Sequence, residues 1–453
     1  CIVYPNHLSS VISLNYKNAH DSVNFDIQVG NNVYQVSTIN GDNSDHLFST
    51  VVPVTAGTLL GEILYYIDML FIAFLIVFVC AGFLIQKPDV LDQRLVSDTG
   101  SFFDFTTDWR CQFLSVCLLL GSSVFLVTEI LGIINLLIPI AIKIIWGIIV
   151  LLIVVVVLKN ASRKSVCISI EPLKSLNKAQ LGLLLFVGCI LMITLLTGVF
   201  SSPNNYDSLT YHLTRVEHWF QNRNVDFYPT HNIRQNISAP WAEYAILNLN
   251  SLCDGDRLSF LVQWVSMLGS LVGVSLITKL LGGNRTAQIW SVVFTATIPM
   301  AILQSISTQN DLTVGFWLVC MVASFLLWRN KPGYRNAIAI GISAGLAVLT
   351  KATAYIYIFP FMLWGVILFF TRREFRKVPQ IILMVSILIG INALFMMRNW
   401  QMYHNLLGDP EYSSQINNTE ISLTGMGATL LRNTLTLAGI SWESISEGIY
   451  PFG

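Results

Sequence analysis

The sequence has few charged residues and no net charge. Only 11% of its 453 residues are Asp, Glu, Lys or Arg, and 54% are hydrophobic. Soluble domains carry roughly a quarter charged residues. The 26 basic and 26 acidic residues cancel, so there is no basic surface of the kind that binds nucleic acid. These shortages exclude a soluble core and a nucleic-acid partner, and they indicate a polytopic membrane protein.

The chain also lacks paired cysteine motifs. Its eight cysteines are scattered without a CxxC pair, which argues against a metal knuckle and a disulfide framework. The histidines at 212, 218 and 231 do not have the spacing of zinc ligands. We therefore expect no metal site of that kind. A divalent cation held by carboxylates stays possible.

Ten apolar runs have the length, or nearly the length, to cross a bilayer, because a spanning helix needs about 20 residues. The expected spans are 61–86, 112–131, 134–158, 181–200, 258–280, 287–306, 311–328, 336–350, 354–370 and 379–397. The predicted fold is thus all-α, with about ten transmembrane helices.

Lysine and arginine gather in loops that ten spans would place on one side. The largest groups are KNASRKSVCISIEPLKSLNKAQ, RNKPGYRN and TRREFRK. Short loops rich in Lys and Arg face the cytoplasm. The other, extracytoplasmic side would then hold residues 1–60, the 201–257 loop, the 308–311 corner, Lys351 and the residues after Arg398.

The first 60 residues show a different pattern. In VNFDIQVGNNVYQVSTI, apolar and polar residues alternate on both sides of a Gly-Asn-Asn turn, which is a β-hairpin signal. We expect residues 1–60 to form a small external β module. Residues 61–180 would add three apolar spans that carry little chemistry.

A polar stretch, PNNYDSLTYHLTRVE, follows the 181–200 run. From 208 to 222 its apolar residues repeat at helical spacing: Leu209, Leu213, Val216 and Phe220. The opposite side carries Tyr211, Arg215, His218 and Asn222. This predicts an amphipathic helix lying on the outer membrane surface. Asp207 and Ser208 stand at its start, where either could cap it. Asp207 is therefore either a cap or a catalytic carboxylate.

The rest of the loop, DFYPTHNIRQNISAPWAEYAILNL, mixes aromatic residues with His231, Arg234 and Glu243. Such a composition suits a pocket for a ligand that is both polar and lipidic, or a loop whose aromatics simply sit at the interface. Asp311 and Lys351 stand at outer ends of spans, where ionisable groups suggest function. Alternatively, Asp311 caps its helix and Lys351 snorkels to the surface.

Four motifs together resemble the GT-C superfamily of membrane glycosyltransferases, and most of all the family that includes protein O-mannosyltransferases and aminoarabinose transferases. They are YDSLTYHLTRVEHW, TQNDLTVGFWLVCMVASFLL, GISAGLAVLTKATAYIYIFPFMLW and MMRNWQMYHNLLGDPEY. The resemblance covers about 181–415 and implies a GT-C-like seven-helix core over 181–400, including the catalytic loop 201–257. The extracytoplasmic segment 401–453 would follow, and the natural chain could continue past Gly453.

The resemblance also implies roles for individual residues. Asp207 matches the acidic residue of the first external loop, although Ser208 stands where many members have a Glu. Asp311 matches a second acidic position, Lys351 the basic residue of an LTK-type motif, and Arg398 an Arg after the last core span. Asp207 and Asp311 would be catalytic, and the two basic residues would bind the donor phosphate.

The implied reaction is transfer of a sugar, a hexose or a pentose, from a polyprenyl-phosphate donor to a glycan, lipid or protein acceptor. It would occur on the extracytoplasmic face of the plasma (inner) membrane. A base or orienting carboxylate is needed for the acceptor hydroxyl, and cations are needed for the leaving phosphate. Further phosphate ligands could be Arg215 or Arg234. The expected pocket residues are Tyr211, His212, His231 and Glu243.

Two other functions compete with this one. A transporter or flippase would place ionisable residues near the membrane midplane and show inverted repeats. Here those residues gather on one face, and the two halves of the chain show no repeat. A membrane-anchored sensor would use the external β module but would give the 201–257 loop no role. The sequence favours the enzyme, and membrane lipid is a partner in every case.

Overall fold

The computed structural model describes residues 11–17, 24–29, 32–37, 45–51, 108–161, 176–201, 203, 205–412 and 422–437. The chain forms two compact units, Cys1–Leu75 and Ile76–Gly453. Each unit is described by itself.

The first unit contains two antiparallel strand pairs. Strand β1 (Val11–Lys17) pairs with β4 (Asp45–Val51), and β2 (Asn24–Val29) pairs with β3 (Asn32–Ser37). The β2–β3 pair joins the two alternating segments for which the sequence predicts a hairpin. An external location for this unit stays a prediction.

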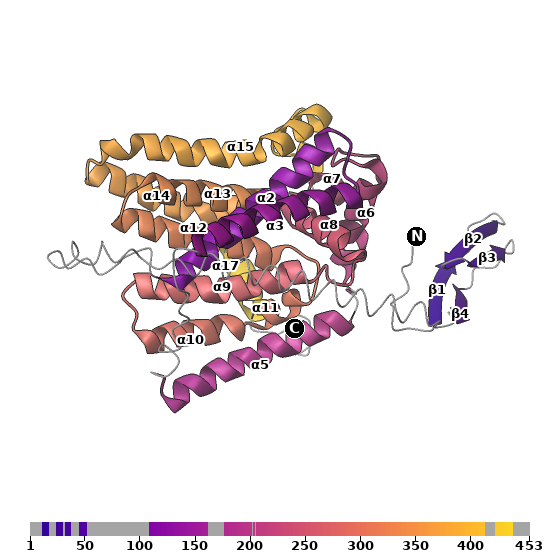
Figure 1. Ribbon diagram of the computed structural model, residues 1–453, viewed down its shortest axis with the longest axis horizontal. Coiled ribbons are helices and arrows are strands. Elements are labelled where there is room, and N and C mark those ends of the chain that lie inside the picture. The colour runs from indigo at the N-terminus through magenta and orange to yellow at the C-terminus, as the bar shows by residue number, and fades with distance from the viewer. Residues whose placement is uncertain are drawn as a thin grey trace. The chain divides into compact units, whose positions relative to one another are not determined.

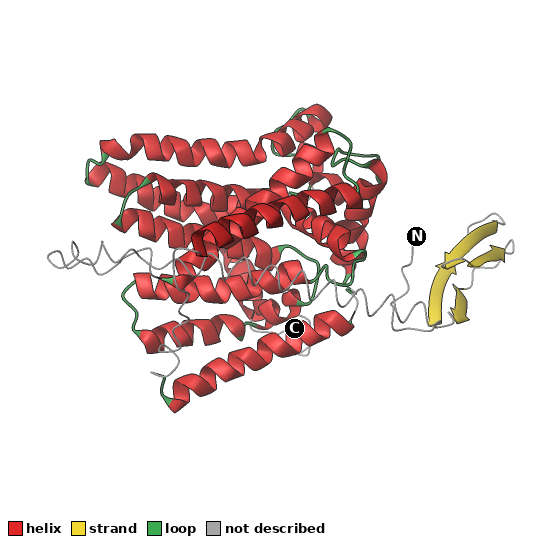
Figure 2. Ribbon diagram, in the orientation of Figure 1, coloured by secondary structure: helices red, strands yellow, loops and turns green. Residues whose placement is uncertain are grey.

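All the secondary structure that the structure describes in the second unit is helical (Figure 2). Six helices pack side by side in a row (Figure 1). In the order of the row they are α15 (Val378–Tyr403), α13 (Tyr334–Thr350), α12 (Asp311–Asn330), α9 (Leu261–Leu280), α10 (Arg285–Ala296) and α5 (Lys178–Phe200). Most of α12 and α13 is buried, so they form the centre of the bundle.

Other helices flank this row. Helix α14 (Ala354–Thr371) packs on α12 and α13, and α2 (Trp109–Ile133) packs on α13 and α9. Helix α8 (Trp241–Cys253), in the 201–257 loop, contacts α2 and α3 (Pro139–Ala161). A further helix, α17 (Leu423–Leu437), follows the row in the sequence.

Polar contacts tie the 201–257 loop to α2 and α3. The indole of Trp241 donates to the carbonyl oxygen of Gly121 at 3.0 Å, and the indole of Trp146 donates to Asn248 Oδ1 at 2.8 Å. Lys143 pairs with Asp254 at 2.5 Å. Helices α2 and α3 lie outside the sequence resemblance, yet they support the loop that it predicts to be catalytic.

Among the described residues, six helices are long and apolar enough to cross a membrane. They are α2, α5, α9, α12, α14 and α15, the last extended by the 3₁₀ turn η3 (Phe375–Lys377). The expected spans 134–158 and 336–350 correspond to the shorter apolar helices α3 and α13. The expected span 61–86 lies outside the described residues. The all-α membrane fold is thus confirmed, whereas ten spans and a seven-helix core stay predictions.

The expected span 287–306 is a bent pair rather than one helix. Helix α10 and the short α11 (Pro299–Ser305) meet at 65°. The proline at the first position of α11 accounts for the break, because it pushes the preceding Ile298 out of the helical region. Counted as one span, the pair raises the number of full-length spans in the described part to seven.

The expected helix over 208–222 forms, and most of its predicted apolar stripe is buried: Val216 is fully buried, and Leu213 and Phe220 pack against the core. It begins with a π-helical turn, η2 (Ser208–His212), and continues as α6 (Leu213–Asn222). Leu209, from the predicted apolar stripe, is 54% exposed, whereas Arg215, from the predicted polar side, is 2% exposed. The predicted stripe is therefore buried except at Leu209, and Arg215 is buried as well because Glu243 of α8 offers it a charged partner.

Candidate active site

Asp207 does not cap the helix that it precedes. Its backbone is already helical, and its side chain makes no capping hydrogen bond. The amide of Ser208 instead donates to Asn205 Oδ1 at 2.8 Å. The capping interpretation of Asp207 is therefore wrong, and its carboxylate is available for other contacts.

The carboxylate of Asp207 faces partners from two distant segments. Gln309 Nε2 donates to Asp207 Oδ2 at 3.3 Å, and Arg234 lies 3.7 Å from Asp207 Oδ1. The Asp207 side chain is 34% exposed and that of Arg234 46%, so both remain accessible. Burial, followed by the negative charges of Asp207 and Glu243, raises the pKa of Tyr211. That phenol stays protonated beside the carboxylate.

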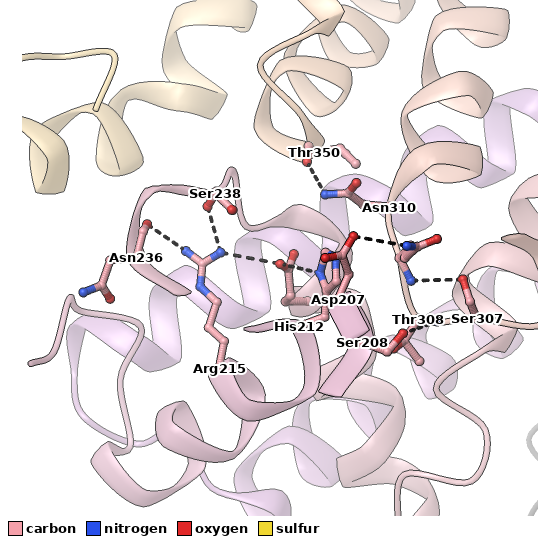
Figure 3. A network of polar contacts seen from close by, with 12 residues as sticks. Asp207, Ser208, His212, Arg215, Asn236, Ser238, Ser307, Thr308, Asn310 and Thr350 are labelled. Carbon is pink, nitrogen blue, oxygen red and sulfur yellow. Dashed lines mark hydrogen bonds and ion pairs between the residues drawn. The ribbon is translucent and has the colours of Figure 1, made fainter. Parts of the chain in front are cut away.

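Ser208 fixes the corner that holds Gln309. Its buried hydroxyl accepts a hydrogen bond from the amide of Thr308 at 3.3 Å (Figure 3). The amide of Gln309 donates to Ser307 Oγ at 3.3 Å. Ser208 thus does not cap the helix either. It joins the start of η2 to the 307–311 corner.

The same corner carries the second predicted acid. Asp311 Oδ1 lies 2.5 Å from the ammonium of Lys351, and Asp311 makes no capping hydrogen bond in α12. Asn310 Nδ2 donates to the carbonyl oxygen of Thr350 at 3.2 Å, which holds the end of α13 against the start of α12 (Figure 3). Gln309 and Asp311 are two residues apart, so this corner touches both Asp207 and Lys351.

A buried charged cluster underlies η2 and α6. Glu243 of α8 is fully buried, and its Oε1 lies 3.0 Å from His212 Nδ1 and 3.5 Å from Arg215. Burial opposes ionisation of Glu243, but the hydrogen bond with His212 and the charge of Arg215 lower its pKa overall. Glu243 is therefore a carboxylate, and it explains why Arg215 of α6 faces inward.

Arg215 contacts both this cluster and the backbone of the loop. It donates to the carbonyl oxygens of Ser238 at 2.7 Å and Asn236 at 3.3 Å (Figure 3). Its guanidinium also lies 4.6 Å from the centre of the Trp219 ring. With 2% of the residue exposed, Arg215 holds the loop together and is poorly placed to meet a phosphate.

Arg398 is engaged with a residue from the other end of the chain. It makes two hydrogen bonds to Glu129 of α2, at 2.9 and 2.6 Å, and a third to the Tyr244 hydroxyl at 2.8 Å. That hydroxyl donates to Glu129 Oε1 at 2.6 Å. A phosphate could bind Arg398 only by displacing Glu129 from these hydrogen bonds. Only 10% of the Arg398 side chain is exposed.

Arg234 is the exposed cation beside Asp207. Its Nε donates to the Tyr412 hydroxyl at 2.8 Å, and its guanidinium lies 5.9 Å from the centre of the Tyr211 ring. Arg234 belongs to the short helix α7 (Arg234–Ile237). His231 lies nearby in the sequence and is exposed. The structure thus brings Asp207, Arg234 and Tyr211 together at an accessible surface, while His212 and Glu243 lie buried beneath it.

Sequence reasoning missed three partners. Gln309 lies in the TQND motif, but the site residue predicted from that motif was Asp311. Tyr412 is the last residue of the MMRNWQMYHNLLGDPEY motif, but no role was predicted for it. Glu129 had a clear signal, because a carboxylate within an apolar run is rarely without a partner. The expectation that the spans before 180 carry little chemistry stays a prediction, although Glu129 of α2 pairs with Arg398.

Within the residues that the structure describes, no group of three or more His, Cys, Asp and Glu side chains could hold a metal ion. Asp207 and Asp311 each pair with a cation instead.

Taken together, a bundle of apolar helices and a loop with an accessible carboxylate, cations and aromatic rings define a membrane enzyme acting on a polar, lipid-linked substrate. A family model described as dolichyl-phosphate-mannose-protein mannosyltransferase matches residues 238–396, about a third of the chain. The match confirms the resemblance to the GT-C membrane glycosyltransferases that use a lipid-phosphate sugar donor.

The matched region has defined limits within the site. It includes Glu243, Asp311 and Lys351, and it begins after Asp207 and Arg234. Comparison of the chain with curated proteins and with solved structures gives no match. The roles of Asp207 and Arg234 therefore depend on the sequence motifs and on the geometry described above.

Proposed function

We propose that this chain transfers a sugar from a polyprenyl-phosphate donor to an acceptor hydroxyl on the extracytoplasmic face of the membrane. Mannose is the sugar in the description of the matching family, and it is the first candidate. The observation that carries the proposal is the carboxylate of Asp207. It is free of the helix cap, partly exposed, and held by Gln309 and Arg234.

Asp207 would act on the acceptor. Its carboxylate accepts the proton of the acceptor hydroxyl as the acceptor oxygen bonds to the anomeric carbon of the sugar. The bond between that carbon and the phosphate oxygen breaks, and its electron pair leaves with the polyprenyl phosphate. The proton on Asp207 then passes to solvent, and the carboxylate is restored.

Cations near Asp207 would stabilise the departing phosphate as its negative charge grows. Arg234 suits this role best, because 46% of its side chain is exposed and its guanidinium fork matches phosphate oxygens. Lys351 is a second candidate, and its side chain is 35% exposed. Its charge is shared with Asp311, so a phosphate would compete with that carboxylate. Arg215 and Arg398 would instead support the site.

For the acceptor, we propose only the chemical group that reacts. It presents a hydroxyl at the membrane surface, and it could be a glycan, a lipid or a protein. The apolar surfaces of the bundle would hold the prenyl chain of the donor. The proposed extracytoplasmic location rests on the distribution of Lys and Arg in the sequence. The Asp311–Lys351 pair places these two residues at one end of the bundle.

The decisive experiment is transfer by Asp207→Asn in membranes supplied with polyprenyl-phosphate mannose. General base catalysis typically contributes about 10²–10⁴-fold in rate, so kcat should fall by that range while the protein folds and inserts normally. Asp226→Asn, an exposed acid of the same loop, is the matched control and should keep wild-type activity. Wild-type transfer by Asp207→Asn would remove Asp207 from catalysis.

A further inference from the structure

An apolar cavity of about 390 Å³ lies between α12, α13, α14 and α15, apart from the site described above. Its walls include Phe325 and Trp328 of α12, Phe361 and Phe369 of α14, and Ile381 and Val385 of α15. Its volume is typical of ligand pockets. None of its lining residues has a role in the glycosyl transfer proposed above.

The cavity lies towards the end of the bundle that is opposite the Asp311–Lys351 pair. On α12 and α15, every lining residue belongs to the half of the helix next to the 372–377 turn. On α15 the lining runs from Val378 to Leu388, which is about 15 Å of helix. That length equals about half of the roughly 30 Å hydrocarbon core. The cavity therefore fits a chain that enters from one leaflet.

Cations surround the end of the cavity where such a chain would enter. The ammonium of Lys377 lies 4.7 Å from the centre of the Trp328 ring, and it also pairs with Glu374 at 2.7 Å. The guanidinium of Arg329 lies 5.2 Å from the Trp364 ring, which contacts Phe325. Three further exposed cations lie on the adjoining turn: Arg372, Arg373 and Arg376.

We propose that this cavity binds one acyl chain of an anionic phospholipid, whose headgroup meets the cations around 372–377 and Arg329. Topology alone accounts for basic residues at this end, but it does not require an apolar cavity behind them. A donor prenyl chain would carry its phosphate to the opposite end, near Lys351, and would place no phosphate near these cations. The proposal is independent of the glycosyl-transfer mechanism.

The test uses the full chain, reconstituted with equal amounts of dioleoyl phosphatidylglycerol and dioleoyl phosphatidylcholine, then extracted and washed. Lipids retained per protein are measured by mass spectrometry. Each basic residue near a membrane surface corresponds to about a fivefold preference for anionic lipid, so phosphatidylglycerol should be retained at least fivefold over phosphatidylcholine. Arg372→Gln combined with Arg376→Gln should bring the two lipids towards equal retention.

A matched pair of neighbouring residues tests the cavity itself. Val366 lines the cavity and is 50% exposed, while Ile367 does not line it and is 51% exposed. Val366→Trp should fill the cavity and abolish selective retention, whereas Ile367→Trp should leave it unchanged, with equal thermal stability showing that both fold. Unchanged retention in Val366→Trp, equal retention of both lipids by the wild type, or displacement of phosphatidylglycerol by polyprenyl phosphate would overturn the proposal.

Discussion

Gln309 donates a hydrogen bond to Asp207 at 3.3 Å and so joins two segments that lie 102 residues apart. Asp207 makes no capping bond in its own helix. Its orientation therefore depends on Gln309 from the 307–311 corner and on Arg234 from α7. This dependence makes Gln309 a positioning residue for the proposed base.

Gln309→Ala should lower kcat by about tenfold, because one hydrogen bond to a charged group is worth roughly 1.5–3 kcal/mol and water replaces part of it here. Steady-state transfer assays in membranes measure the effect. The donor KM should change little, since Gln309 does not face the phosphate in our proposal. Gln221→Ala, an exposed change in α6, is the control. A Gln309→Ala enzyme with normal kcat would show that Asp207 needs no such support.

Arg234→Gln should raise the donor KM by about tenfold or more, because a charge-assisted, two-armed contact with phosphate would be lost. Arg234→Lys should recover only part of the affinity, since an ammonium cannot form the fork. Donor titration at saturating acceptor gives the values. Arg223→Gln, an exposed change in the same loop, should behave as wild type. An unaltered donor KM in Arg234→Gln would exclude this arginine from donor binding.

Glu243 should make stability depend on pH in the acid range. Its pKa in the fold lies below the ordinary value of 4.5. A lowered carboxyl pKa gives stability that is present above pH 4.5 and is lost as the pH falls through the folded-state value. Thermal unfolding in detergent should show Glu243→Gln as less stable at pH 7, with the difference from wild type shrinking below about pH 4.5. A difference that stayed constant with pH would contradict an ionised Glu243.

Glu129→Gln should destabilise the protein by roughly 3–5 kcal/mol, because removing one partner of a buried ion pair leaves the other charge unpaired. Arg398→Gln should cost a similar amount. Combining Glu129→Leu with Arg398→Met should restore much of the stability, since apolar residues can replace a buried pair. Denaturant unfolding of the wild type, Glu129→Leu, Arg398→Met and their double variant measures the coupling, because the cycle needs the same substitutions in the single and double variants. Additive losses in the double variant would show that the pair contributes no coupling.

Part of this structure could be predicted from the sequence. Long apolar runs fix where helices cross the membrane, because an unpaired backbone is too costly in lipid. That argument located α5, α9, α12, α14 and α15 within a few residues. The order of the motifs pointed to the loop with Asp207 and, separately, to Asp311 and Lys351 as site residues. It did not predict the ion pair between those two. The positions of the helices and of these site residues could be predicted because both depend on patterns that are local in the sequence.

Tertiary partners decided what the sequence could not show. Helical spacing gave α6 an apolar stripe, but burial of Arg215 was decided by Glu243, which lies 28 residues further along. Asp207 stands in a position typical of an N-cap, yet the amide of Ser208 donates its hydrogen bond to Asn205 Oδ1. The ion pair of Arg398 could not be predicted because its partner Glu129 lies 269 positions away in the chain. Each error concerned a polar residue whose partner comes from another element.

The ion pair of Glu129 and Arg398 also bears on how the chain is made. The two residues are 269 positions apart, and ribosomes add about 5–20 residues per second. Helix α2 would therefore enter the membrane with its carboxylate unneutralised and wait tens of seconds for its partner. Until α15 arrives, the nascent chain needs a protonated Glu129, a water-lined insertion site or a membrane chaperone. The ion pair of α2 can thus form only after α15, a much later helix in the sequence, has entered the membrane.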